Sequence, residues 1–204
     1  MSLITRRVVL LTSASALLMS AMPLRAWAQA DRSAEANRFI AQFGNQLVGI
    51  VNADEPLARK RQQMQPLVEQ ALSVDEIGTF VLGRYWRIAT PAQQQRFLRL
   101  FHAILVNTIT EKLGDFRGVA FRLTQTTVRD GDYLVGTLIT RPNQQPNNAQ
   151  WVVSFQSGRP VIIDVLAEGT SLRLTQRSDY AAFISRNNNN VDALLNALER
   201  QAGA

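Results

Sequence analysis

Residues 119–165 read VAFRLTQTTVRDGDYLVGTLITRPNQQPNNAQWVVSFQSGRPVIIDV, and apolar side chains recur in four separate runs of this stretch at every second position. Such alternation is typical of β-strands. Asp130-Gly131-Asp132 marks a tight turn, and polar loops at 142–148 and 157–160 separate the later runs. We therefore expect four strands in an antiparallel meander. The alternating residues are Val119, Phe121, Leu123, Tyr133, Val135, Ile139, Trp151, Val153, Phe155, Val161, Ile163 and Val165.

The opposite faces of these strands are also rich in apolar residues, so we expect helices to cover part of both faces of the sheet. Between residue 31 and about Gly114 the period is helical. We expect one helix around residues 39–50, a second over about 54–72 with Pro56 in its first turn, and a third over about 74–86. The stripe that predicts the first helix is Phe39, Phe43, Leu47 and Ile50.

Two further signals place helix ends. Thr90-Pro91-Ala92-Gln93 predicts an N-terminus in which the Thr90 and Gln93 side chains form a capping box, and Gly114 suits the end of that helix. After the sheet we expect a helix over about 173–186 and a terminal helix, separated by a turn at Asn187–Asn190. These patterns predict an α+β fold with N-terminal helices, a four-stranded antiparallel meander and C-terminal helices.

The composition excludes several classes of protein. The 204 residues contain no cysteine and one histidine, His102, which rules out disulfide scaffolds and thiol catalysis and leaves no Cys/His zinc site. The formal charge is +6, but the first thirty residues hold three arginines and no acid, and the remaining charges are interspersed. We therefore expect an ordinary solvated surface and no nucleic-acid partner.

Residues 1–30 resemble a cleaved export signal. Arg6 and Arg7 precede an apolar stretch over 8–22, and small residues then alternate around Ala28. The mature chain is expected to begin near Gln29 or Asp31, after export by either the general secretory or the twin-arginine route. No cysteine is available for a lipid anchor, so we expect the product free in the periplasm.

No arrangement of residues indicates catalysis. His102 lies in a helical pattern where a structural role is the more common one. Asp164 and Glu168 could form a carboxylate pair suited to glycoside chemistry, although carboxylates at a strand end more often cap helices or pair with arginine. The sequence has no glycine-rich phosphate loop, no nucleophile elbow and no plausible metal ligand set. We expect no enzymatic activity, no cofactor and no metal.

The large aromatic residues lie on two expected helices and on one face of the expected sheet. If these surfaces interdigitate fully they form a core, and if the helices stand off from the sheet they line a dry cavity. Composition does not distinguish the two arrangements.

Four motifs of the chain are specific enough to compare with known families: Leu82-Gly83-Arg84-Tyr85-Trp86, Asp164-Val165, Glu168-Gly169 and Gln176-Arg177-Ser178-Asp179-Tyr180. They resemble the MlaC family, the periplasmic phospholipid-binding components of the Mla lipid-transport system. One departure is Asn188-Asn189, where family members commonly have glycine. The same family includes the hopanoid-associated protein HpnM, and the motifs do not separate the two.

The resemblance implies that residues 31–204 form a lipid-binding domain whose sheet and helices enclose an apolar cavity, with the lipid headgroup toward solvent. It implies shuttling between an outer-membrane lipoprotein complex and an inner-membrane ABC transporter with an MCE-domain subunit. We expect a monomer. The alternatives are a hopanoid-associated lipid carrier and a lipid-free periplasmic adaptor.

Periodicity gives eight candidates for the cavity lining, four on helices and four on strands. They are Tyr85, Phe97, Phe101, Leu105, Val135, Val153, Ile163 and Val165. Four residues of the family motifs, Asp164, Glu168, Gln176 and Arg177, are expected to fix the corner after the last strand through charge-assisted hydrogen bonds. The alternative for Arg177 is contact with the lipid headgroup.

Overall fold

The computed structural model describes residues 24–111 and 117–203. Most of the expected export signal, residues 1–23, lies outside the described residues, and so does Gly114. The first helix starts at Leu24 and runs through the expected cleavage region.

The α+β fold is confirmed. In chain order the elements are α1 (Leu24–Asn52), α2 (Leu57–Ala71), α3 (Val74–Leu82), the 3-10 helix η1 (Gly83–Arg87), α4 (Pro91–Glu111), β1 (Ala120–Arg129), β2 (Asp132–Thr140), β3 (Asn147–Ser154), β4 (Val161–Ala167), β5 (Thr170–Ser171), α5 (Leu172–Arg186) and α6 (Val191–Ala202).

The sheet is an antiparallel meander in the order β1-β2-β3-β4-β5, with a fifth strand beyond the four expected. Strand β5 has only two residues, Thr170 and Ser171, which pair with the end of β4. A strand this short has no alternating pattern, so periodicity does not reveal it. The β1–β2 hairpin turns at Asp130 and Gly131, both with positive φ, as the sequence predicts.

A β-bulge in β4 changes which residues share a face. Val152 pairs with Asp164, but Val153 pairs with Ile162, so Ile163 is an extra residue on its strand. As a result Ile162 lies in the same buried cluster as Val153, whereas Ile163 lies in the cluster on the opposite face.

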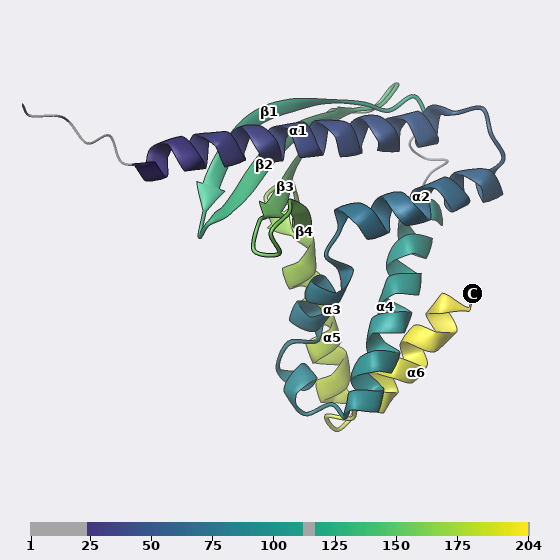
Figure 1. The fold of residues 1–204 in the computed structure, drawn as a ribbon. Helices are drawn as coiled ribbons and strands as arrows, with labels where there is room; N and C mark the ends of the chain where they lie inside the picture. Colours follow the sequence, from purple (N-terminus) through teal and green to yellow (C-terminus); the bar gives the residue numbers. More distant parts are fainter. Residues whose placement is uncertain (1–23, 112–116, 204) are drawn as a thin grey trace, which may run out of the picture.

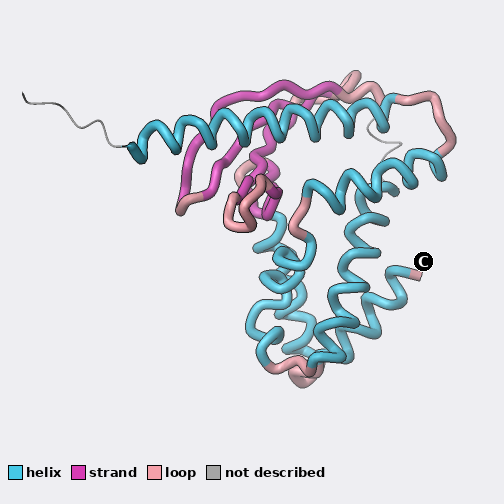
Figure 2. Tube along the Cα trace, in the orientation of Figure 1, coloured by secondary structure: helices cyan, strands magenta, loops and turns pink. Residues whose placement is uncertain are grey.

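The helices are arranged in two groups (Figures 1 and 2). Helix α1 lies along one face of the sheet, against β1 and β2, and α2 doubles back beside it. Helices α3, α4, α5 and α6 form a second group below, where α4 packs on α6 and α3 on α5. Helices α3 and α5 also contact β4 and so link the second group to the sheet.

Local signals explain where the helices begin and end. The capping box is confirmed: the Thr90 backbone N–H donates to Gln93 Oε1 (2.9 Å), and the Gln93 N–H donates to Thr90 Oγ1 (3.2 Å). Asn188 and Asn189 adopt positive φ between α5 and α6, and Asn190 caps α6 by accepting from the Asp192 N–H (2.9 Å).

Two expected boundaries were wrong. Pro56 lies just before α2 and not in its first turn. The expected helix over 74–86 ends at Leu82, because Gly83 has a φ of 59° and the chain continues as η1. The Gly83 backbone faces Arg177: a Cβ atom there would lie 2.8 Å from Arg177 Nε.

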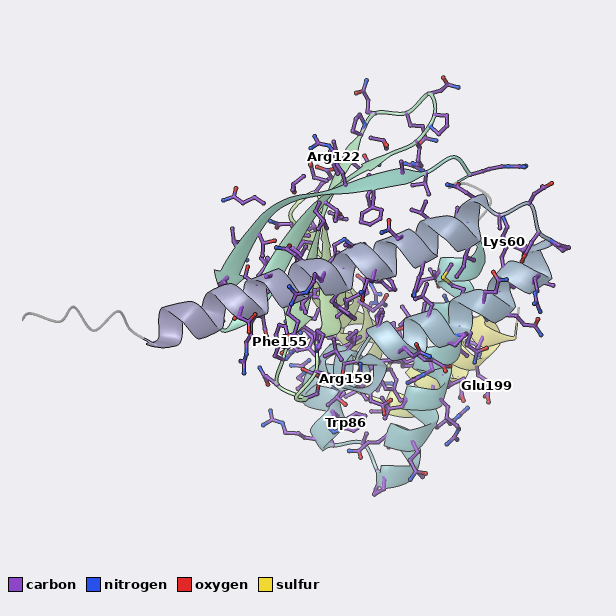
Figure 3. The ribbon with its side chains drawn as sticks, turned by 45° about the horizontal axis from the view of Figure 1, so that its top comes forward. Lys60, Trp86, Arg122, Phe155, Arg159 and Glu199 are labelled. Atoms are coloured by element: carbon purple, nitrogen blue, oxygen red, sulfur yellow. The ribbon has the colours of Figure 1, made fainter. Side chains whose placement is uncertain are left out.

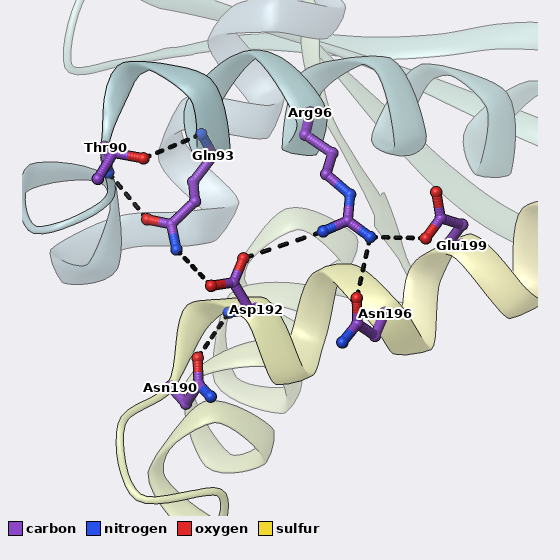
Figure 4. A network of polar contacts seen from close by, with 7 residues as sticks. All are labelled: Thr90, Gln93, Arg96, Asn190, Asp192, Asn196 and Glu199. Atoms are coloured by element: carbon purple, nitrogen blue, oxygen red, sulfur yellow. Dashed lines mark hydrogen bonds and ion pairs between the residues drawn. The ribbon is translucent and has the colours of Figure 1, made fainter.

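Polar side chains fasten α4 to α6 (Figure 4). Gln93 Nε2 donates to Asp192 (2.9 Å), and Arg96 donates to Asn196 (2.9 Å) and Glu199 (2.6 Å). These contacts hold the lower helical group together at its surface. Among the described helices, none is long and apolar enough to cross a membrane.

Candidate functional site

The four helical lining candidates lie in the lower helical group. Tyr85, Phe97 and Phe101 are buried in one cluster formed by α3, η1, α4, α5 and α6, and Leu105 packs against it. The rings of Phe97 and Phe101 stack at 5.7 Å between centroids. The Tyr85 hydroxyl donates to Asn189 Oδ1 (2.9 Å), which fixes this ring within the protein.

The four strand candidates divide between the two faces of the sheet. Val135 and Val153 are fully buried beneath α1, and Val165 packs against the same cluster. Ile163 is buried on the other face because of the bulge. The structure therefore does not bring the eight candidates together around one space.

Open space lies elsewhere, in a groove between α1 and α2. It consists of two hollows of about 430 Å³ each, which share Gln46, Leu67 and Gln70 in their walls. Each volume falls within the range of about 300–1,000 Å³ that ligand sites occupy. The other lining residues are Gly49, Ile50, Gln63 and Pro66 in the first hollow, and Phe39, Gln42, Phe43, Ala71 and Arg159 in the second. None of the eight candidates lines either hollow.

The floor of the groove is continuous with the buried cluster beneath α1. Phe39, Phe43, Leu67 and Ala71 line the second hollow and also pack in the cluster that contains Val135 and Val153. Phe43 contacts Trp151 of β3 edge-on at 5.5 Å between ring centroids. A ligand in the groove would thus contact the apolar cluster that α1 and α2 form with the sheet.

The rim of the groove is polar. Gln42, Gln46, Gln63 and Gln70 carry side-chain amides on the two helices, and Arg159 extends from the β3–β4 loop. Sequence reasoning missed these residues because glutamine on an amphipathic helix indicates ordinary solvent exposure. The apolar stripe Phe39, Phe43 and Leu47 does indicate a face of α1 that packs against something. The sequence of α1 alone, however, does not show that α2 leaves part of this face uncovered.

Comparison with known proteins identifies the fold and the family. The family described as MlaC protein matches residues 41–200, which is most of the chain. This chain belongs to the MlaC family. Among solved structures it is similar to the phospholipid-binding protein from Ralstonia solanacearum in complex with a phospholipid, with a TM-score of 0.73 and 19% sequence identity. The match covers 83% of this chain and 97% of that one, and at this identity it shows a shared fold.

In this MlaC-family chain, Asp164 is the centre of the corner after β4. It is buried and accepts hydrogen bonds from the Val165 N–H (2.8 Å), the Ser171 hydroxyl (2.5 Å) and the Arg173 N–H (3.1 Å). Arg173 Nε lies 3.4 Å from the same carboxylate. Ser171 in turn caps α5 by accepting from the Leu174 N–H (3.1 Å). These contacts tie β4, β5 and α5 together.

The other three family-motif residues are placed differently. Glu168 is exposed, has a positive φ of 47° and accepts from the Asn148 N–H (2.6 Å). Arg177 does not pair with Asp164; its guanidinium lies over the Phe80 ring, 4.8 Å from the centroid, beside that of Arg173. Gln176 is half-buried, and its side chain has no hydrogen bond to any described residue. None of these residues lines the groove.

The side chains considered for catalysis have partners within the fold. His102 Nε2 lies 3.0 Å from Asp75 Oδ1 at the surface, where the pair links α4 to α3. The oxygens of Asp164 and Glu168 accept hydrogen bonds from backbone and hydroxyl donors, as described above. Within residues 24–111 and 117–203, no three His, Asp or Glu side chains gather in a way that could hold a metal ion.

Proposed function

We propose that this MlaC-family chain is a periplasmic carrier that binds a phospholipid with its acyl chains in the groove between α1 and α2. The observation that supports this most is the continuity between the hollows and the apolar cluster on the sheet. Acyl chains placed there replace water over Phe39, Phe43 and Leu67. Val135, Val153 and Val165 lie deeper in the same cluster and would form the floor beneath the chains.

The energetics favour a carrier over a transient binder. Burying about fifteen methylenes yields on the order of 12 kcal/mol before costs. Association and ordering consume about 4–15 kcal/mol of this gain. One acyl chain would be held weakly and two firmly, so spontaneous release into water would be slow. Release therefore requires a partner that opens the groove or competes for the lipid.

Membership of the MlaC family and the resemblance of residues 1–30 to an export signal support a transport role. We propose that the carrier moves lipid between an outer-membrane lipoprotein complex and an inner-membrane ABC transporter with an MCE-domain subunit. An apolar groove without a reactive side chain can bind a lipid and release it, and neither step makes or breaks a covalent bond.

The test is the lipid content of protein purified from the periplasm without added lipid. Native mass spectrometry and organic extraction should recover a diacyl phospholipid at about one molecule per chain. Recovery of a hopanoid instead would favour the HpnM-like alternative. Lipid-free protein that also takes up nothing from phospholipid vesicles would refute the carrier function and favour an adaptor.

A variant that fills the groove sharpens this test. Gly49 lines the first hollow, and a Cβ atom there would meet no heavy atom within 4 Å. Gly49→Trp should therefore occupy the hollow without straining the fold and lower the amount of bound lipid. Gly49→Ala is the matched control and should keep the lipid content of the original protein. Equal lipid content in both variants would place the acyl chains outside this groove.

A further inference from the structure

The residues that line the groove carry charge of one sign only. Among the residues that line the two hollows, Arg159 is the only charged one, and no carboxylate is present. Arg159 belongs to the second hollow, beside Phe39, Gln42 and Ala71. In Figure 3 it lies below α1, at the end of α2 that is nearer the sheet.

The Arg159 side chain is oriented by one hydrogen bond. Its Nη1 donates to the backbone carbonyl oxygen of Gln70 in the last turn of α2, at 2.9 Å. The side chain is exposed, and its other N–H groups have no hydrogen-bond partner among the described residues. A guanidinium that is oriented by one hydrogen bond and keeps its other N–H groups available can donate to two oxygens of a phosphate.

A second cation packs against the β3–β4 turn from α1. Arg32 of α1 is positioned over the ring of Phe155, 5.6 Å from its centroid, and Phe155 is joined to Gly158 by a backbone hydrogen bond of 3.0 Å just before Arg159. Figure 3 shows Phe155 and Arg159 on this side of the molecule. Arg32 lines neither hollow, but it adds positive charge beside the β3–β4 turn that carries Arg159. The part of the groove next to this turn is called its hairpin end.

The other polar residues that line the second hollow are neutral. The amides of Gln42, Gln46 and Gln70 have no side-chain hydrogen bonds within the described part of the chain. They can donate to ester oxygens and accept from glycerol hydroxyls. A lipid ammonium group there would meet Arg159, and no residue that lines the hollow carries a carboxylate to balance it.

We infer that Arg159 binds the headgroup phosphate at the hairpin end of the groove and makes the site selective for phospholipids with a net negative headgroup. The inference rests on the proposed function, because it assumes that acyl chains occupy the groove. An anionic lipid such as phosphatidylglycerol places one uncompensated charge beside Arg159, whereas phosphatidylcholine also brings a cation that the arginines repel.

The experiment is a competition from mixed vesicles that contain equal amounts of phosphatidylglycerol and phosphatidylcholine with identical acyl chains. Mixed vesicles present the same surface to both lipids, so general attraction of a basic protein to the membrane cannot bias the choice. Native mass spectrometry gives the ratio of the two lipids bound to the full mature chain. We expect phosphatidylglycerol to be favoured roughly threefold to tenfold at low salt and less at about 1 M salt.

Arg159→Gln should bring this ratio close to one while the total amount of bound lipid stays the same. Arg159→Lys should keep part of the preference, because it keeps the charge and loses the planar fork. The matched control is Arg122→Gln. Arg122 is exposed on β1 next to Phe121, which faces α1, so its own side chain points to the other face of the sheet (Figure 3). This control should leave the ratio unchanged.

Two results would overturn the inference: equal binding of both lipids by the original protein, or a preference that survives in Arg159→Gln. Loss of the preference for phosphatidylglycerol in the presence of millimolar glycerol phosphate would indicate that Arg159 binds soluble phosphates. That result would also overturn the inference. Absence of any bound lipid is a different outcome, because it refutes the carrier function itself.

Discussion

The α1 backbone at Gly44 rests directly on the ring of Phe121 in β1. A Cβ atom at Gly44 would lie 2.2 Å from Phe121 Cζ, which is far closer than two carbon atoms can approach. Glycine is therefore required where the helix crosses the strand. This contact sets the distance between α1 and the sheet, and α1 is one wall of the groove.

We predict opposite effects for the same substitution at Gly44 and Gly49, which both lie in the C-terminal part of α1. Gly44→Ala should lower the free energy of unfolding by about 1–3 kcal/mol, because the new methyl group forces the helix away from Phe121. Gly49→Ala should raise it by about 0.5–1 kcal/mol, since alanine favours the helix and meets no neighbour within 4 Å. Urea denaturation followed by circular dichroism measures both.

Two stabilised variants in that experiment would show that Phe121 moves aside freely. In that case the Gly44 contact would not set the position of α1.

Asp164 should matter for stability far more than Glu168. Asp164→Asn replaces one buried carboxylate oxygen by an amide that cannot accept from the hydroxyl or N–H donors around it, and we expect a loss of about 2–3 kcal/mol. Glu168→Gln changes an exposed group that accepts one backbone N–H, and we expect a loss below about 1 kcal/mol. A large loss of stability in Glu168→Gln and none in Asp164→Asn would reverse our assignment of the corner.

We predict that the ionisation of Tyr180 lowers the free energy of unfolding at high pH. Burial, and secondarily the Asp179 carboxylate, raises the pKa of Tyr180 to about 12 from the ordinary value of 10.0. Between these two values the unfolded chain releases the phenol proton and the folded chain keeps it. The contribution of Tyr180 to the free energy of unfolding is therefore fully present below pH 10. It is lost as the pH rises toward 12, by up to about 3 kcal/mol.

Tyr180→Phe isolates this contribution from the other groups that titrate at high pH. The phenylalanine keeps the edge-on contact with Phe97, whose ring centroid lies 6.1 Å away. The variant should lose less stability than the original protein between pH 10 and 12, as measured by urea titrations. Parallel curves for the two proteins would show that Tyr180 ionises without a penalty in the folded state.

Local chemistry made much of the fold predictable. The capping box at Thr90 and Gln93 and the turn residues around Asn188 act within a few positions of the chain, and the structure has them as expected. The alternating runs also gave the meander and its order. By contrast, β5 is too short to show a period. The end of α3 was also missed, because the side chains around Gly83 keep a helical pattern while its backbone has a positive φ.

The candidate site was harder to predict because it depends on contacts between distant elements. Periodicity marks Phe97, Phe101 and Val135 alike as buried residues, yet the first two lie among α3–α6 and the third beneath α1. The bulge at Ile163 reverses one face of a strand, and strict alternation has no way to signal it. Arg159 lies at the groove because the loop that carries it packs against α2, a contact between distant parts of the chain that periodicity does not show.

The most direct test of the carrier function is to locate the acyl chains by cross-linking. The protein is loaded with a phospholipid that carries a photoreactive diazirine on one chain, irradiated and digested, and the labelled peptides are identified by mass spectrometry. We predict labels within residues 39–50 of α1 and 63–71 of α2. Labels concentrated within 97–105 of α4, or no label at all after loading with lipid, would contradict the groove between α1 and α2 as the binding site.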